Sequence, residues 1–153
     1  MPLNIADLSI SCRQFDAGER IPDLHSADHG NVAPDLKITG VPEGTVELAV
    51  IMHDPDAPLP RGFVHWVCYG IAPSTTWVEG AGSGRNHREG PNTLGEKAYS
   101  GPQPPPGHGT HHYYFWVYAL NTAVKGEPTR EEFLADYAEA IIEQNRVVGT
   151  YSS

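Results

Sequence analysis

Residues 45–71, TVELAVIMHDPDAPLPRGFVHWVCYGI, contain two runs that are typical of buried β-strands. Residues 45–53 and 63–71 are mostly apolar and rich in β-branched and aromatic side chains, and a stiff Pro- and Asp-containing segment separates them. A third run of this kind covers residues 111–120, and weaker candidates cover residues 7–11 and 36–39. With 16 Gly and 14 Pro in 153 residues, strands joined by turns are favoured over a helical bundle. The sequence therefore predicts a mainly β protein.

One amphipathic helix is predicted near the C-terminal end. Thr129 and Glu132 have the spacing of a capping box, which satisfies free amides at the start of a helix. The apolar residues of one helical face then follow: Phe133, Leu134, Tyr137, Ala138, Ile141 and Ile142. Gly149 is a suitable end for this helix. We expect the helix to pack on the β core and residues 1–153 to form a single domain.

Composition and charge argue against several classes of protein. Asp and Glu total 19 against 10 Lys and Arg, and the net charge of −9 comes without any basic run, so nucleic-acid binding is not expected. No apolar run is long enough to span a bilayer, and the first residues lack the features of a secretory signal. We therefore predict a cytoplasmic protein without stable membrane insertion. Cys12 and Cys68 lack the paired spacing of a metal site, and this compartment argues against a disulfide between them.

Polar side chains gather at the ends of the predicted strands. The segment HDPDAP at residues 53–58 follows the first strand, and His65 lies in the second. The segment GPQPPPGHGTHHY at residues 101–113 leads into the third strand and ends an irregular stretch that starts at residue 80. A stretch of this length without secondary structure points to a function. Because β scaffolds commonly place ligand sites on rigid loops at strand ends, we predict that the two segments form one polar pocket.

Asp54 and His65 are expected to meet in this pocket. Asp54 directly follows a buried strand, where a carboxylate needs a partner, whereas Asp56 is expected to accept hydrogen bonds from amides of the turn. His65 shares a strand face with Phe63 and Val67 and would approach Asp54 from the adjacent strand. A carboxylate beside an imidazole favours the imidazolium, so we expect a raised pKa for His65 and a charged ring that holds an anion.

The second segment supplies the opposite wall of the pocket. His111 and Tyr113 are two residues apart on a strand and share one face, while His112 points the other way. Gly107 and Gly109 bring bare backbone amides to the start of that strand, and clustered amides bind anionic oxygens. These groups predict a pocket for a small anion.

The sequence contains no motif of a common catalytic class. It has no G-x-S-x-G, H-E-x-x-H, C-x-x-C or P-loop, and no dinucleotide-binding glycine pattern in a strand–helix context. The histidines of residues 108–112 could bind zinc together with Asp54 and His65, so a metal-binding or weakly hydrolytic protein stays open as an alternative. No nucleophile is evident for such a hydrolysis. We expect no enzymatic activity, no metal and no cofactor.

Three groups of these residues match a known family. They are DPDAP at residues 54–58, the pair His65 and Trp66, and the pattern Y-x-G-P-x-P-P-x-G-x-G-x-H-x-Y that runs from Tyr99 to Tyr113. Together they resemble the phosphatidylethanolamine-binding protein family, and most closely its bacterial and archaeal branch, the Raf kinase inhibitor-like proteins. Further matches at residues 15–22, 30–34 and 149–151 extend the resemblance over most of the chain.

The resemblance implies two antiparallel β-sheets with a Greek-key element. It also implies a pocket for phosphate, acetate or a phosphorylated head group. Carried over residue by residue, the ligand-binding residues are Asp54, Ala57, Pro58, His65, Gly107, Gly109, His111 and Tyr113. The chain has His112 where the family usually has arginine, which leaves open whether the salt bridge often made there, to Asp56, forms.

The function expected from these observations is binding without catalysis, with a small phosphorylated or carboxylated molecule as the ligand. Because the family includes regulators of proteases and kinases, an inhibitor or scaffold that binds such a protein partner is the first alternative. Resemblance to the prokaryotic branch also implies a homodimer.

Overall fold

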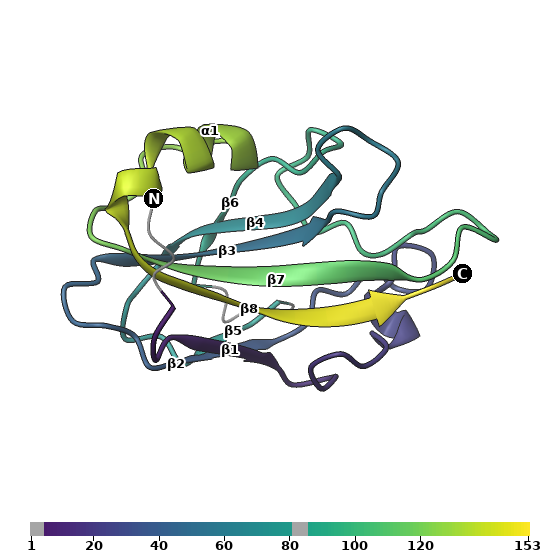
Figure 1. Ribbon diagram of the computed structural model, residues 1–153, viewed down its shortest axis with the longest axis horizontal. Coiled ribbons are helices and arrows are strands. Elements are labelled where there is room, and N and C mark those ends of the chain that lie inside the picture. Colours follow the sequence, from purple (N-terminus) through teal and green to yellow (C-terminus); the bar gives the residue numbers. More distant parts are fainter. Residues whose placement is uncertain (1–4, 81–85) are drawn as a thin grey trace.

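The computed structural model describes residues 5–80 and 86–153, and these residues form two antiparallel β-sheets (Figure 1). The strands of the larger sheet are β3 (Glu47–Asp54), β4 (Phe63–Ile71), β6 (Arg88–Glu89), β7 (His111–Leu120) and β8 (Ile141–Tyr151). They lie in the order β6-β4-β3-β7-β8. The smaller sheet has the order β1-β2-β5 and consists of β1 (Ser9–Cys12), β2 (Leu36–Thr39) and β5 (Trp77–Val78). The predicted mainly β, two-sheet fold is confirmed.

A short helix, α1 (Arg130–Asp136), follows β7, and 3₁₀ turns occur at η1 (Asp23–His25) and η2 (Ala138–Ala140). The predicted capping box is present: the Thr129 hydroxyl accepts from the Glu132 amide at 3.2 Å, and the Glu132 carboxylate accepts from the Thr129 amide at 2.9 Å.

The prediction that this helix continues to Gly149 was wrong. The helix ends at Asp136, and Ile141 begins β8, which pairs with β7 from Ile141 opposite Leu120 to Tyr151 opposite His111. Residues 141–151 are rich in β-branched side chains, and as a strand they satisfy the backbone of β7 along its whole length. This tertiary pairing outweighs a helical spacing that ends with Ile142.

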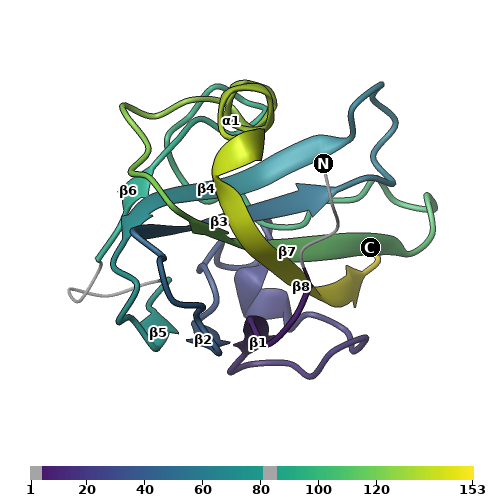
Figure 2. The ribbon, with the colours of Figure 1, turned by 60° about the vertical axis from the view of Figure 1, so that its left-hand side comes forward.

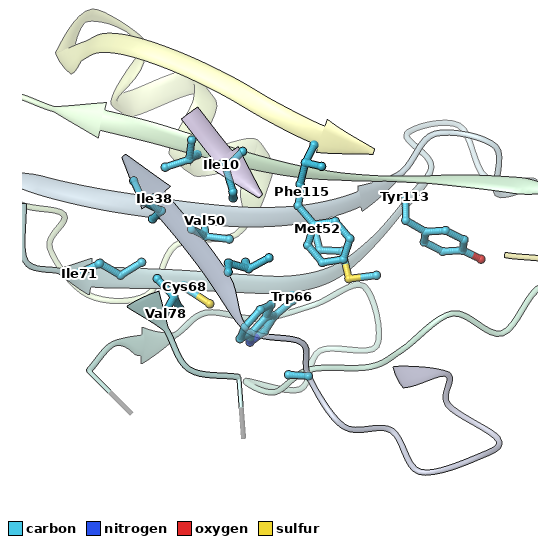
Figure 3. Close-up of a cluster of buried hydrophobic side chains, with 14 of the residues drawn as sticks. Ile10, Ile38, Val50, Met52, Trp66, Cys68, Ile71, Val78, Tyr113 and Phe115 are labelled. Carbon is cyan, nitrogen blue, oxygen red and sulfur yellow. The ribbon is translucent and has the colours of Figure 1, made fainter. Parts of the chain in front are cut away.

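The central strand of the large sheet, β3, is buried on both faces. The small sheet covers one face and α1 covers part of the other (Figure 1 and Figure 2). Side chains from both sheets fill the space between them, as Figure 3 shows for Ile10, Ile38, Val50, Met52, Trp66 and Phe115. On the outer face, Phe133 of α1 packs on Tyr69 and Tyr118, with ring centroids 5.5 and 5.3 Å apart. Burial of both faces explains why β3 has a continuous apolar sequence in place of an alternating one.

The topology brings three strand ends together. Asp54, at the end of β3, pairs with Phe63 at the start of β4, and His53 pairs with Tyr114 near the start of β7. The described part of the connection between β6 and β7 contains no further helix or strand, and its last residues run into β7 at this same end. The predicted site segments therefore lie at one end of the large sheet.

Two further findings concern membranes and cysteines. No helix among the described residues has the length and apolar character needed to cross a membrane. Cys68 is buried in β4, and within the described residues it forms no disulfide with Cys12.

Candidate functional site

The turn between β3 and β4 fixes the carboxylate of Asp54. Asp54 Oδ1 accepts a hydrogen bond from the Asp56 amide at 2.8 Å, as in an Asx turn, and His53 Nε2 donates to the Arg61 carbonyl at 2.8 Å. Gly62 has a φ of +66°, and a Cβ atom there would lie 2.3 Å from the Asp54 carbonyl oxygen. This close approach requires glycine and keeps the turn tight, with Asp54 only 2% exposed.

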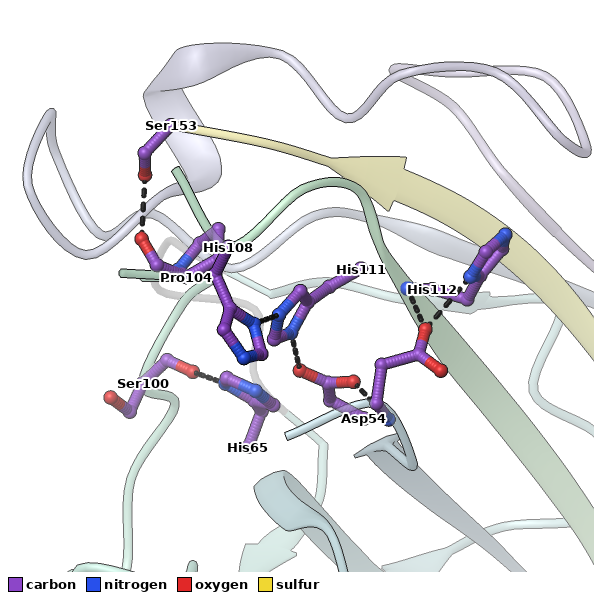
Figure 4. A network of polar contacts seen from close by, with 9 residues as sticks. Asp54, His65, Ser100, Pro104, His108, His111, His112 and Ser153 are labelled. Carbon is purple, nitrogen blue, oxygen red and sulfur yellow. Dashed lines mark hydrogen bonds and ion pairs between the residues drawn. The ribbon is translucent and has the colours of Figure 1, made fainter. Parts of the chain in front are cut away.

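Asp54 binds His111, and His111 contacts His108. The carboxylate of Asp54 accepts from His111 Nδ1 at 2.7 Å, and His111 Nε2 lies 2.6 Å from His108 Nδ1 (Figure 4). Both members of the first pair are buried, whereas His108 is exposed. Our prediction that His65 hydrogen-bonds Asp54 was therefore wrong, since His111 is the imidazole that pairs with this carboxylate.

A β-bulge sets the direction of His65. Met52 of β3 pairs with Trp66, but the next residue, His53, pairs with Val64, so His65 is an extra residue on β4. Val67 packs in the outer apolar cluster, while His65 lines a cavity at the end of the sheet. The expected common face of His65 and Val67 is therefore not found, because the bulge interrupts the alternation of side chains.

His65 is neutral near pH 7. Its Nδ1 lies 2.6 Å from the Ser100 carbonyl oxygen, which can only accept, so Nδ1 carries the hydrogen (Figure 4). Burial lowers the pKa of His65 to about 4, against the opposing effects of nearby backbone carbonyls and of the Asp54 charge. The expected rise of this pKa was wrong, because desolvation outweighs the carboxylate. Among the described residues, the buried Nε2 has no hydrogen-bond partner.

Tyr113 lies between the two histidines of the site. It is 1% exposed, its ring meets that of His65 edge to face at 5.2 Å, and it stacks on His111 at 6.4 Å. Burial raises the pKa of Tyr113, so the hydroxyl stays protonated and can donate a hydrogen bond. The prediction that His111 and Tyr113 share one face of β7, with His112 on the other, is confirmed by their burial pattern.

These side chains surround a cavity of about 300 Å³. The predicted residues that line it are Asp54, Ala57, Pro58, His65, His111 and Tyr113. Gly107 and Gly109 are not among the lining residues. They have φ values of +75° and +84° with open space at the Cβ position, so these two glycines shape the loop through backbone conformation.

Eight further residues line the cavity and were not among the predicted ligand-binding residues. They are Leu59, Phe63, Leu94, Ser100, Gly101, Gln103, Pro104 and Pro105. Five of them belong to the segment 100–105 that precedes the glycines, and the density of proline there was the available signal of a rigid wall.

The arrangement of the His, Cys, Asp and Glu side chains bears on the zinc alternative. The described residues contain no group of three or more His, Cys, Asp or Glu side chains placed to hold a metal ion. The zinc set considered from the sequence is not assembled, because His65 Nδ1 bonds a carbonyl and both nitrogens of His111 contact Asp54 and His108.

Comparison with known proteins identifies the family. The sequence profile described as phosphatidylethanolamine-binding protein matches residues 11–152. The chain belongs to this family.

A UPF0098 protein of Aquifex aeolicus is 34% identical over an alignment that covers 95% of this chain and 89% of the relative. Among solved structures, YbcL of Escherichia coli, described as a member of the mammalian family, superposes with a TM-score of 0.87 at 28% identity and covers 97% of this chain and 99% of its own. A family homologue from Chlamydia trachomatis has a TM-score of 0.86 at 29% identity, with 95% of this chain and 97% of its own covered.

This member of the phosphatidylethanolamine-binding protein family holds Asp56 through a histidine. Asp56 Oδ2 accepts hydrogen bonds from the backbone amide of His112 at 2.7 Å and from its Nδ1 at 2.8 Å. Burial alone would raise the pKa of Asp56, but these bonds outweigh it and lower the pKa. Asp56 therefore pairs with β7 in place of the turn amides that we predicted, and the contact to Asp56 that the sequence left open is made by His112.

Proposed function

We propose that this chain is a ligand-binding protein that holds a small oxyacid group, a phosphate or a carboxylate, at the joined ends of β3, β4 and β7. The observation that carries this proposal is the convergence of Asp54, His65, His111 and Tyr113 on one cavity. Its volume of about 300 Å³ is at the lower limit of ligand pockets. A space of this size suits a head group, and the acyl chains of a lipid would have to remain outside it.

The proposed role is binding without catalysis. Ser100 lines the cavity, but it contacts His65 through its backbone carbonyl, at 2.6 Å from Nδ1. That contact uses the ring as a donor, so it does not activate the Ser100 hydroxyl as a base would. The arrangement therefore supports a fixed binding wall.

The sequence predicted that a charged His65 ring attracts the oxyacid, and the structure points to a different source of affinity. His65 is neutral, and the lining residues include the Asp54 carboxylate but, in the described chain, neither lysine nor arginine. A charged imidazole at His65 therefore does not hold the ligand. Hydrogen bonds, with the Tyr113 hydroxyl as a donor, have to supply the affinity.

Titration of ¹⁵N-labelled protein with inorganic phosphate tests this proposal. Amide signals of residues 100–101 and 111–113 should shift in a saturable manner. Tyr113→Phe should weaken binding about three- to tenfold, which corresponds to one hydrogen bond. Tyr114→Phe is the matched control, because Tyr114 is the next residue on β7 and does not line the cavity. Absence of saturable shifts with both phosphate and acetate would refute the proposal.

A further inference from the structure

We infer that the ligand of this cavity must donate a hydrogen bond to the protein, so that a protonated phosphomonoester is bound in preference to a phosphodiester. This inference rests on the proposed function, because it specifies which form of an oxyacid the cavity takes. It follows from the hydrogen-bonding roles of two side chains in the wall.

His65 presents an acceptor. Because the Ser100 carbonyl at 2.6 Å can only accept, the hydrogen of the neutral ring lies on Nδ1 and a lone pair lies on Nε2. Nε2 is buried, and no described residue is its hydrogen-bond partner. A buried acceptor without a donor is unfavourable, and a donor on the ligand would remove that penalty.

Asp54 presents a second acceptor in the same cavity. Its two oxygens accept from the Asp56 amide and from His111 Nδ1, and a carboxylate has further lone pairs available. A fully deprotonated oxyanion has only acceptors and negative charge, so it is repelled by the acceptors of His65 and Asp54. One P–OH group turns that repulsion into a hydrogen bond, while another phosphate oxygen can accept from Tyr113.

The titratable groups around the cavity come from each element that packs against it. They are Asp54 of β3, His65 of β4, His111 and Tyr113 of β7, and His108 of the preceding loop, with His53 and Asp56 beside them. A phosphomonoester has a second pKa of about 6, so its own protonation changes over the pH range of interest. A useful test must therefore separate protonation of the ligand from protonation of the protein.

Methyl phosphate and dimethyl phosphate make this separation. At pH 5.5 most methyl phosphate is a monoanion with one P–OH, whereas dimethyl phosphate has the same charge and no hydroxyl. Calorimetry at constant ionic strength should show methyl phosphate binding at least about tenfold more tightly, as expected for a hydrogen bond to a charged group. At pH 8 the monoanion falls to about 1% of methyl phosphate, so its affinity should fall about 50- to 100-fold. Dimethyl phosphate does not titrate, and its change over the same range measures the contribution of the protein.

Two variants test the wall itself. Asp54→Asn replaces a pure acceptor with an amide that can donate, so it should reduce the preference for methyl phosphate over dimethyl phosphate. Tyr113→Phe removes a donor and should weaken both esters by similar factors. If Asp54→Asn does not fold, the comparison on the unaltered protein still decides the inference.

The outcomes separate this inference from the proposed function. Equal affinities of the two esters at pH 5.5, or methyl phosphate binding that is as tight at pH 8 as at pH 5.5, would overturn the donor requirement and leave the binding function standing. Failure of both esters, inorganic phosphate and acetate to bind at either pH would overturn the proposed function and the inference with it.

Discussion

Burial of His65 links the stability of the fold to pH. Its pKa is about 4 in the folded protein and 6.5 when exposed. Above pH 6.5 the ring is neutral in both states, but below it only the unfolded chain takes up the proton. The contribution of His65 to stability is therefore full above pH 6.5 and decreases as pH falls, by about 2 kcal/mol at pH 5. Burial also lowers the pKa of His53, which adds to the loss in the same direction.

Urea unfolding at pH 7 and pH 5 measures this loss. His65→Gln should have a smaller difference in unfolding free energy between the two pH values than the unaltered protein. Val64→Ala is the control, because it alters a buried neighbour of His65 without removing a titratable group and should lower the stability by the same amount at both pH values. An identical pH dependence for His65→Gln and the unaltered protein would contradict a neutral buried ring.

Gly62 controls the position of Asp54. A Cβ atom at residue 62 would lie 2.3 Å from the Asp54 carbonyl and 2.8 Å from His53 Nε2, so Gly62→Ala has to displace the turn. We expect a loss of more than about 3 kcal/mol of stability, since strain of the positive φ adds to the steric clash. Gly44→Ala also has a positive φ but meets open space, and it should cost only about 1–2 kcal/mol. Thermal unfolding of both variants checks the difference, and equal losses would show that strain alone matters.

Side-chain alternation and burial of a strand end could be read from the sequence, but the hydrogen-bond partners could not. The spacing of His111 and Tyr113 places both on one face, as found. The pairing of Asp54 with His65 failed because a bulge inserts His65 as an extra residue, and no local pattern in FVHWV marks that bulge. His65 Nδ1 instead donates its hydrogen bond to the backbone carbonyl of Ser100, which is 35 residues away in the sequence.

The capping box sets the start of α1. This helix spans only seven residues, too few to be stable alone, so its cap and the docking of Phe133 must hold it. Thr129→Ala should reduce the unfolding free energy by about 1 kcal/mol, while Thr129→Ser should retain most of it because the hydroxyl is kept. Chemical denaturation of the two variants is the measurement. A loss with serine as large as that with alanine would mean that the methyl group, and not the cap, is responsible.

At the level of elements, β4, β7 and β2 were predictable from the sequence and β8 was not. The ranges 63–71, 111–120 and 36–39 agree with β4, β7 and β2 residue for residue. By contrast, β8 was taken as helix, because its first isoleucines extend the apolar face of α1. Residues 141–151 form a strand because they pair with β7. This is a contact between distant segments, and the local spacing of apolar residues carries no information about it.

The oligomeric state of the whole molecule stays a prediction. Resemblance to the prokaryotic branch of the family implies a homodimer, and sedimentation at micromolar concentration should show a species of twice the 16.6 kDa chain mass. A single species at the monomer mass would refute it.

The charge of the whole molecule acts on an anionic ligand before the cavity does. With a net charge of −9 at pH 7, the protein repels anions at long range, and salt screens this repulsion within a Debye length of about 10 Å at 0.1 M. The affinity for dimethyl phosphate at pH 7, where the net charge is −9, should therefore rise, by about two- to threefold, when NaCl is raised from about 10 to about 150 mM. Chloride can only accept hydrogen bonds, so it should compete poorly for a wall that presents acceptors. At pH 5.5 the protein is close to its pI of about 5.2, so the affinities of dimethyl phosphate and of monoanionic methyl phosphate should change little with salt. An affinity that falls with salt would instead indicate capture by positive charge, which is what a charged His65 would have supplied.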